Sequence, residues 1–419
     1  MKKKSELNQW IKKKQYQIKM KVVKTSISKI ENWVLSNKEI YNKKRNFFSI
    51  KPFQIQVNKK KKWFQPLIIQ KEVGILGIIK KKIDLVDHYL LQAKVEPGNI
   101  NKLQLSPTVQ ATKSNYLQKH GGKKTNYLEY FIKKKSNIKV ITSLKLSEQG
   151  TRYLNKANRN ILVDVKNKKI EKNSNYIWLS KENIIYLLGK KNLLNMDTIS
   201  VFSSAIKKNF TDFPVIKLSI IIKKLNNFKK KNKIFKKAAL FNELKKWKIF
   251  KDRIEHIKKL FFSILFINVK TNSREVKEWS QPLISDYFNA YNAFLLKRVN
   301  NTTHYFLQII LEPGFNSPMY TTTISLKNFD NRKNYSNVEF LHFFKKKNLT
   351  NFTYSDEGGR FFKNESINSI YFLKNDKKFT KKNNFIWVSH NQIIDLIKKN
   401  LLTIEARNLF ACFNIDKIH

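Results

Sequence analysis

The sequence predicts an α+β fold made of two tandem copies of one domain, each with a mixed or mostly antiparallel sheet and packed helices. Three observations support this prediction. Distinctive motifs recur in the same order in both halves of the 419-residue chain. Short apolar runs of strand length alternate with turn residues, and capped helical patterns follow them in both halves. Hydrophobic residues make up 41% of the chain, which suffices for packed cores.

The rarer residue types carry the duplication. Six of the seven tryptophans pair between the halves, and Glu96 lies 216 residues before its counterpart Glu312. The matched segments are FFSI at 47–50 and 261–264, WFQPLI at 63–68 and WSQPLI at 279–284, the His–Gln–Glu-Pro-Gly segments that begin at His88 and His304, SEQGTRY at 147–153 and SDEGGRF at 355–361, and LLNMDTISVFSS at 193–204 and LLTIEARNLFAC at 401–412. We therefore expect a basic lead at residues 1–29, a first repeat at 30–204, a Lys-rich linker at 205–243 and a divergent second repeat at 244–419.

Local patterns predict the elements in order. The lead should be helical around residues 8–19, strands should span residues 73–80 and 87–96, and Pro97-Gly98 should form a turn. A further strand is expected at 160–165. The segment SKENIIYLLGKK predicts a helix capped by Ser180 and ending near Gly189, and SHNQIIDLIKKN from Ser389 repeats that helix. The segment 226–237 should be exposed and partly helical.

The formal net charge of +54 would ordinarily indicate nucleic acid or an anionic membrane as a partner. Only nine of the 84 basic residues are arginines, however, and the lysines are spread along the chain. Because Lys, Asn, Ile and Phe share A- and T-rich codons, mutational bias can raise the charge without any nucleic-acid partner, and we do not expect such a partner. No run of about 18 apolar residues indicates a membrane span. The single cysteine, Cys412, is typical of a reducing cytoplasm.

At these motifs the chain resembles the sugar-nucleotide 2,3-dehydratases, the NDP-hexose 2,3-dehydratase family. The matching segments are WFQPLI, QAKVEPGN at 92–99, QLSPTVQATKSNY at 104–116, HGG at 120–122, SEQG at 147–150, NRN at 158–160, NMDT at 195–198, REVKEWSQPLI at 274–284, EGGRFF at 357–362 and EARNL at 405–409. The resemblance spans nearly the whole chain. It implies two Nudix-like domains, a homodimer, and a dTDP-4-keto-6-deoxyhexose substrate. The family converts this substrate to a 3,4-diketo-2,6-dideoxy sugar, on which a downstream 3-ketoreductase acts.

That reaction needs no redox cofactor, because tautomerisation of an enol supplies the second carbonyl. The chain accordingly has neither a GxGxxG fingerprint nor a P-loop. Neither copy has the helix of several glutamates with which Nudix hydrolases hold Mg²⁺, so we expect no metal site.

The chain departs from the family pattern at several positions. Ile199 stands where the first-half NMDT motif usually continues with arginine, which removes an expected anion contact. The second half has SPMYTTTIS at 317–325 in place of PTVQAT and HGG, and Ile310 replaces Lys94. We therefore expect the first copy to keep the chemistry and the second to be structural or an auxiliary binding site. The alternative for the whole chain is a catalytically degenerate sugar-nucleotide-binding protein.

The reaction requires a base for the C3 proton, a group that stabilises the enolate oxygen, and an acid for the departing C2 hydroxyl. The candidates are His120, Tyr116 and Glu148. His120 titrates near neutral pH and precedes two glycines, although it could equally be a loop histidine bonded to backbone groups. Tyr116 could instead pack in the core. Glu148 could form an ion pair with Arg152, four residues later.

Substrate contacts are expected from the same motifs. Arg152 and Arg159 suit a diphosphate, because a guanidinium fork matches phosphate oxygens, with Lys94 or Lys156 assisting. Trp63 could stack on thymine, although its counterpart in the second half favours core packing. Glu96 precedes a Pro-Gly turn and could cap turn amides instead. The other expected substrate-binding residues are Asn99, Gln104, Thr108, Gln110, Thr112, Asn115, Gly121, Gly122, Gln149 and Asn160.

Overall fold

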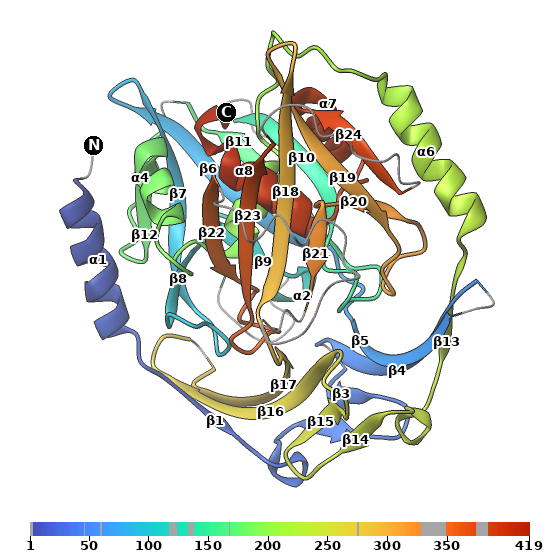
Figure 1. Ribbon diagram of the computed structural model, residues 1–419. Helices are drawn as coiled ribbons and strands as arrows, with labels where there is room; N and C mark the ends of the chain where they lie inside the picture. The colour runs from blue at the N-terminus through green and yellow to red at the C-terminus, as the bar shows by residue number, and fades with distance from the viewer. Residues whose placement is uncertain are drawn as a thin grey trace.

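The computed structural model describes residues 3–45, 47–58, 61–116, 124–132, 138–166, 168–274, 276–327, 349–373 and 384–419, with only the backbone of residues 115 and 116. Within these ranges the chain forms two seven-stranded sheets and two five-stranded sheets (Figure 1). The α+β class predicted from the sequence is confirmed.

The large sheet of the first repeat contains the predicted strands. Its order is β10-β11-β6-β7-β12, with β8 beside β7 and β9 beside β6. The strands are β6 Gly74–Ile83, β7 Val86–Val95, β8 Leu103–Ser106, β9 Val109–Ala111, β10 Lys139–Ser147, β11 Ala157–Asp164 and β12 Tyr176–Ser180. The pair of β6 and β11 is parallel and the other pairs in this sheet are antiparallel. The strands expected at 73–80, 87–96 and 160–165 are therefore confirmed as β6, β7 and β11.

The second repeat builds the same sheet from its own strands. Its order is β20-β19-β18-β23-β22, with β21 beside β18 and β24 beside β19, and here β18 and β23 form the parallel pair. The strands are β18 Ala290–Val299, β19 Thr302–Ile310, β20 Met319–Thr321, β21 Ile324–Leu326, β22 Thr350–Ser355, β23 Glu365–Phe372 and β24 Phe385–Ser389. The internal duplication inferred from the motifs thus appears as one topology built twice.

Each five-stranded sheet takes one strand from the other half of the chain. The first contains β2 Trp33–Leu35, β3 Ile40–Asn42, β4 Ser49–Val57, β5 Lys61–Ile69 and β13 Ile234–Ala238; the second contains β14 Trp247–Ile249, β15 Arg253–His256, β16 Phe262–Thr271, β17 Glu278–Asp286 and β1 Met20–Lys24. Strand β1 pairs with β16, and β13 pairs with β4, both antiparallel. The N-terminal segment and the segment between the repeats are therefore exchanged counterparts.

The helices follow the same duplication. Helix α1 (Lys4–Gln17) precedes β1 just as α6 (Leu218–Lys231) precedes β13, and the two flank opposite sides of the molecule (Figure 1). Helices α4 (Lys181–Leu188) and α7 (His390–Lys398) begin at Ser180 and Ser389 as predicted. Helices α5 (Met196–Ser203) and α8 (Ile404–Phe413) pack against each other, and the short α2 (Lys113–Tyr116) and α3 (Glu129–Ile132) follow β9. None of the described helices is long and apolar enough to cross a membrane.

Reciprocal hydrogen bonds join the repeats about an approximate twofold axis. Gly98 N donates to Gly358 O at 2.8 Å, and its counterpart Gly314 N donates to Gly150 O at 2.6 Å. A Cβ atom on Gly98 would lie 1.6 Å from a carbonyl oxygen of the opposite repeat, and one on Gly314 would lie 1.8 Å from another. Each Glu-Pro-Gly turn therefore contacts the Gly-containing loop of the other copy directly, as in an isologous dimer interface.

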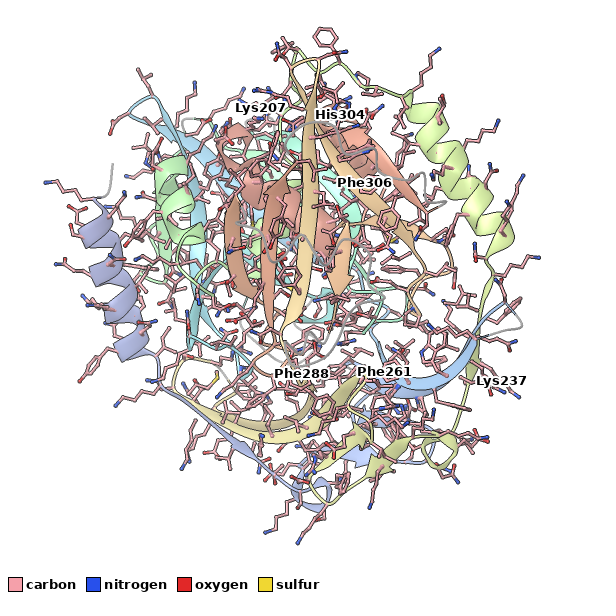
Figure 2. All side chains as sticks on the ribbon, viewed as in Figure 1. Lys207, Lys237, Phe261, Phe288, His304 and Phe306 are labelled. Carbon is pink, nitrogen blue, oxygen red and sulfur yellow. The ribbon has the colours of Figure 1, made fainter. Side chains whose placement is uncertain are left out.

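Side chains fill the space between these layers (Figure 2). One apolar cluster includes residues of α4, α5, α7 and α8 together with strands of both large sheets. In the second repeat Phe306 stacks on Trp387 with ring centroids 4.6 Å apart. The repeated histidines have backbone partners: His88 Nδ1 lies 2.9 Å from Val86 O, and His304 Nδ1 lies 3.1 Å from Thr302 O. These bonds give the two histidines a structural role.

Candidate active site

A cavity of about 310 Å³ lies between the two repeats. The first repeat contributes the end of β7, residues 110–112 after the start of β9, the segment 148–158 and the first turn of α5. The second repeat contributes Ser273, Arg274 and Gln281 and most of the loop 357–360. Both copies are therefore needed to build this cavity, whereas the sequence led us to expect a site in the first copy alone.

Lys94 and Glu96 form an ion pair at the end of β7. They are two residues apart, so both can lie on one face of the strand, and Lys94 Nζ is 2.9 Å from Glu96 Oε1. Burial alone would raise the pKa of Glu96, but the positive charges of Lys94, Arg274 and Arg360 outweigh burial and hold the pKa below its ordinary value. Glu96 Oε2 has no hydrogen-bond partner among the described residues and remains available to a ligand.

Two further carboxyl groups line the cavity in less compensated surroundings. Glu148 directly follows β10, and its Oε1 accepts a hydrogen bond from Asn158 Nδ2 at 2.8 Å. Asp197 lies in the first turn of α5, and its Oδ2 accepts from Gln110 Nε2 at 2.6 Å. Burial raises the pKa of Glu148, and burial together with Glu357 and Glu148 raises the pKa of Asp197 well above its usual range. Asp197 therefore favours the protonated acid.

The loop from the second repeat adds one acidic and one cationic side chain, Glu357 and Arg360. Tyr153 Oη donates to Glu357 Oε2 at 3.4 Å, and burial, followed by the charge of Glu96, raises the pKa of Glu357. Arg360 lies over the ring of Phe48 at 4.2 Å, and its Nε has no hydrogen-bond partner within the described part of the chain. An unpaired buried guanidinium N–H is costly in a folded protein, so a bound anion would stabilise this arrangement.

Two more cations complete the lining. Arg274 Nη2 donates to Val95 O at 2.9 Å and lies 4.0 Å from Glu96 Oε1. Lys156 Nζ donates to Glu72 O, and burial lowers the pKa of Lys156. Within the residues that the structure describes, no group of three His, Cys, Asp or Glu side chains could hold a metal ion.

The structure places the two arginines that we expected at the diphosphate outside this cavity. Arg152 does not line this cavity, because the loop that carries it crosses to the second repeat, where Arg152 Nη2 lies 2.5 Å from Asp286 Oδ1. This ion pair also means that Arg152 is not the partner of Glu148. Arg159 is exposed on β11, and Gln149 Nε2 donates to Asp356 Oδ1 at 3.3 Å beside Arg152. None of these three side chains lines the cavity between the repeats.

The other predicted residues divide into lining and scaffold. Those that line the cavity are Lys94, Glu96, Gln110, Thr112, Glu148 and Lys156. Gln104 accepts from Asn195 Nδ2 at 3.3 Å, and Thr108 Oγ1 accepts from Ile79 N at 3.0 Å, so both support neighbouring elements. Asn99 Nδ2 donates to Lys102 O at 2.9 Å within the turn after β7. Asn160 is buried behind the cavity wall.

Trp63 lies away from the cavity. Its Nε1 donates to Gln65 Oε1 at 2.8 Å, and its ring packs against the cluster of Phe53, Ile55 and Leu67. His120, Gly121 and Gly122 lie outside the described residues, as do the side chains of Asn115 and Tyr116. Helix α2 begins directly after Thr112, which lines the cavity, so the segment that carries these residues starts at the cavity wall.

Several lining residues were missed as site candidates from the sequence, namely Asp197, Tyr153, Arg274, Glu357 and Arg360. All of them lie in motifs that the two halves share or that carry the family resemblance. Asp197 offered a further signal, because it is an ionisable residue in the otherwise weakly polar helix MDTISVFS. No local sequence pattern indicated that these residues, which are far apart in the chain, come together in one cavity.

A second cavity, of only about 20 Å³, occupies the position related by the duplication. Arg152 takes the place of Arg360 there, Asp356 that of Glu148, and Glu405 that of Asp197. The ion pairs of Arg152 with Asp286 and of Lys327 with Glu405 occupy the space. A volume of this size has room for about one water molecule.

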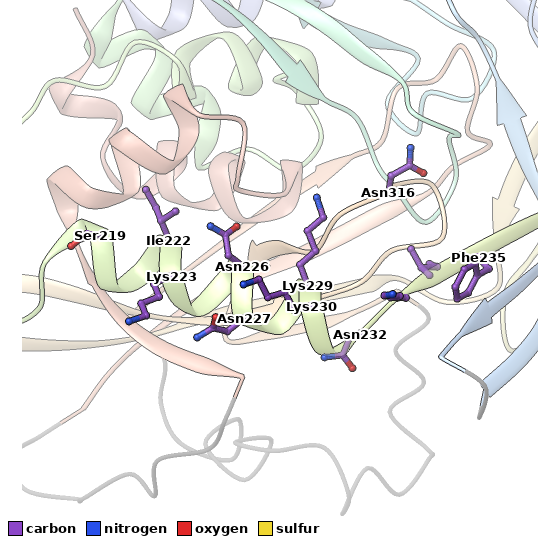
Figure 3. A pocket seen from close by; sticks show the side chains of 12 residues that line it. Ser219, Ile222, Lys223, Asn226, Asn227, Lys229, Lys230, Asn232, Phe235 and Asn316 are labelled. Carbon is purple, nitrogen blue, oxygen red and sulfur yellow. The ribbon is translucent and has the colours of Figure 1, made fainter.

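A larger hollow is an open groove of about 980 Å³ beside α6 (Figure 3). Figure 3 shows that lysine and asparagine side chains of α6, with Phe235 and Asn316, surround it. None of the described residues that line this groove carries a carboxyl group, and the groove lies apart from the shared motifs. The smaller cavity between the repeats is therefore the candidate active site, despite the larger volume of the groove.

Comparison with known proteins agrees with the motifs that line this cavity. The family model described as NDP-hexose 2,3-dehydratase matches residues 4–205 and 219–413. This chain belongs to the NDP-hexose 2,3-dehydratase family. Both matched segments begin at or beside α1 and α6, so the family pattern includes the two helices that precede the exchanged strands.

Similar family members are named dTDP-4-dehydro-6-deoxy-alpha-D-glucopyranose 2,3-dehydratase. The protein of Saccharopolyspora spinosa is 31% identical over 399 residues, which cover 87% of this chain and 81% of the relative. The protein of Amycolatopsis orientalis is 30% identical and covers 84% and 76%, respectively. The protein of Streptomyces violaceoruber is 29% identical and covers 94% and 93%. The similarity to this family therefore extends over both repeats.

Proposed function

We propose that this chain is a sugar-nucleotide 2,3-dehydratase that removes water across C2 and C3 of a dTDP-4-keto-6-deoxyhexose. Family membership supports the reaction class. The observation that carries the proposal is the cavity between the repeats, where buried carboxyl groups with raised pKa values lie together with cationic side chains. This combination supplies an acid, a base and anion-binding groups in one enclosed space.

The diphosphate is best accommodated by Arg274 and Arg360. Both guanidinium groups line the cavity, and Arg360 Nε can donate to a phosphate oxygen without giving up an existing partner among the described residues. Charge-assisted hydrogen bonds of this kind are among the stronger ones in proteins. Lys94 can contribute through its positive charge while it remains paired with Glu96.

The buried acids divide the proton transfers. Glu148 accepts a hydrogen bond from Asn158 and lies near the positive charges of Arg407 and Lys156, which favour its ionised form, so it serves as the base for the C3 proton. The C4 ketone takes up the electron pair as an enolate. Asp197 favours its protonated form and donates its proton to the C2 hydroxyl, which leaves as water. The resulting C2–C3 enol then tautomerises to the 3,4-diketo sugar.

Lys156 supplies positive charge near the developing enolate, since it is buried in the wall that carries Glu148. His120 and Tyr116 stay predictions for proton transfer and for hydrogen bonding to the enolate oxygen. The family resemblance supports a Nudix-like assignment for each repeat, a hydro-lyase class, a homodimer and a downstream 3-ketoreductase, and we propose each of these on that basis. The single cysteine supports a cytoplasmic location, and the tautomerisation of the enol supports a reaction without a redox cofactor.

The reaction can be tested by incubating the purified protein with dTDP-4-keto-6-deoxyglucose in D₂O, with a 3-ketoreductase and NADPH to trap the product. Dehydration followed by tautomerisation places one solvent deuteron at C2 of the dideoxy sugar. Mass spectrometry should find a product that has lost one oxygen and gained that deuteron.

Stoichiometric binding of the substrate without product would contradict the proposal. That result would support the alternative of a catalytically degenerate sugar-nucleotide-binding protein. The other interpretation of the high positive charge is nucleic-acid binding. Measuring the affinity of the protein for random DNA at low and high salt would test it, because nucleic-acid binding requires a steep loss of affinity as salt rises.

A further inference from the structure

Arg407 from the second repeat is buried behind the cavity wall of the first. It lies in α8 with 0% of its surface exposed, and both its Nε and Nη2 donate to Ser200 Oγ of α5, at 3.3 and 3.1 Å. Its Nη1 has no hydrogen-bond partner among the residues that the structure describes. A buried guanidinium with an unpaired N–H is expensive, and an apolar side chain would pack α5 against α8 at lower cost. Packing alone therefore does not explain an arginine at this position.

A continuous chain of hydrogen bonds leads from Arg407 to the proposed base. Ser200 Oγ donates to Asn160 Oδ1 at 2.8 Å, and Asn160 Nδ2 donates to the backbone oxygen of Asn158 at 3.2 Å. Asn158 Nδ2 in turn donates to Glu148 Oε1 at 2.8 Å. Ser200 and Asn160 are fully buried, so water cannot replace either link without rearrangement.

The charges around Glu148 agree with this chain. Burial raises the pKa of Glu148, and Arg407 is the strongest of the influences that oppose burial, followed by Lys156. The acids Glu357 and Asp197 face Glu148 from the second-repeat loop and from α5. The counterpart of Arg407 in the first copy is Ile199, which is 1% exposed and belongs to the apolar core. One guanidinium thus lies between α5 and α8, where two would be expected from the duplication.

We propose that Arg407 is a positioning residue for the reaction: from the second repeat, through Ser200, Asn160 and Asn158, it orients Glu148 and keeps this carboxylate ionised in the first cavity. The inference rests on the proposed function, in which Glu148 is the base. It makes the second repeat part of the acid–base machinery rather than only a wall of the cavity.

The kinetic test compares Arg407→Met, Arg407→Lys and Ser200→Ala with Ser203→Ala. Ser203 is a matched control, because it lies on the same helix, is also buried and donates only to Ser200 O at 2.7 Å. Arg407→Met should lower kcat about tenfold or more and move the acidic limb of the pH profile of kcat/KM upward by about one unit, since a pKa shift of one unit is a tenfold change in acidity. Arg407→Lys should restore part of the shift. Ser200→Ala should lower kcat, and Ser203→Ala should leave it unchanged.

An acidic limb in Arg407→Met that coincides with the wild type would overturn the inference. If Arg407→Met does not fold, equal kcat values for Ser200→Ala and Ser203→Ala would overturn it instead. A second readout does not depend on turnover: thermal unfolding of the wild type, Arg407→Met, Glu148→Gln and the double variant. Coupled residues should give non-additive changes in Tm, and additive changes would refute the link. A wild type without activity would defeat the proposed function and still leave this cycle to decide the inference.

Discussion

The duplication offers a matched pair of arginines that tests which of the two cavities binds the substrate. Arg152 and Arg360 occupy the same position in the two repeats, and each lies over a corresponding ring, Phe262 at 4.7 Å and Phe48 at 4.2 Å. Among the residues that the structure describes, only Arg152 of this pair forms an ion pair with a carboxylate, that of Asp286. We expect Arg152→Met to lower stability with little effect on KM. Arg360→Met should raise KM about 10- to 100-fold with little effect on Tm, because a charge-assisted hydrogen bond contributes about 1.5–3 kcal/mol.

The size of the stability loss follows from the carboxylate that Arg152→Met leaves behind. Burial already raises the pKa of Asp286, and without Arg152 it would take up a proton in the folded state. At pH 7 that costs at most about 4 kcal/mol relative to an unfolded pKa near 3.9, at about 1.36 kcal/mol per pH unit, because the raised pKa of Asp286 already costs the wild type part of this amount. Unfolding of 419 residues has an entropy of about 0.9 kcal/mol/K, so Tm should fall by at most about 4–5 °C.

The pH dependence of this loss has a definite sign. An acid whose folded pKa is raised makes the protein lose stability as pH rises above its unfolded pKa, so the defect of Arg152→Met should shrink to at most about 1.5 kcal/mol at pH 5. The double variant Arg152→Met/Asp286→Asn should recover most of the lost Tm at pH 7. Differential scanning calorimetry at both pH values and steady-state kinetics measure these quantities. A raised KM in Arg152→Met with an unchanged Tm would refute the assignment and return the diphosphate to Arg152.

Three further results are expected. Asp197→Asn should reduce kcat by about 10²-fold or more, because the general acid is lost. The same variant should raise Tm at pH 8, because the raised pKa of Asp197 makes its ionisation destabilising above about pH 4. Equal Tm values for wild type and variant at pH 8 would contradict a buried acid at this position. Gly98→Ala should cost about 1–3 kcal/mol, whereas Gly189→Ala, whose new Cβ would lie 3.4 Å from its nearest neighbour, should be nearly neutral in urea unfolding. Trp63→Phe should leave KM within about twofold, and a larger rise would place Trp63 at the substrate.

The parts of the fold that the sequence predicted correctly depend on local signals. Short apolar runs identified β6 and β7, and Ser180 identified the start of α4, where the side chain of Ser180 accepts from Asn183 N. The repeated rare residues revealed the duplication because a lysine-rich composition makes conserved positions stand out. The strand and helix-cap signals need only neighbours within one helix or strand.

The exchange between repeats could not be predicted in this way. Pairing of β1 with β16 joins residues about 250 positions apart, and neither strand carries a pattern that specifies its partner. The same holds for the loop of Arg152, whose direction is set by the contact of Gly150 with Gly314 in the other copy. The guanidinium of Arg152 was therefore assigned to the site of the first copy, whose motifs are nearest in sequence. It lies instead in the second cavity, across the twofold axis.

Two of the positions at which the cavities differ place charged groups in the second one. Thr112 and Gln70 of the first copy correspond to Lys327 and Asp286 of the second. Each replacement adds a charged group that pairs inside the second cavity, with Glu405 and with Arg152, and so fills the volume that the first cavity leaves open. Reopening the second cavity would remove two buried ion pairs and expose acids such as Asp356, whose pKa burial raises to about 7. In this structure internal contacts therefore fill the second cavity, while the loop of the second copy at 357–360 completes the first.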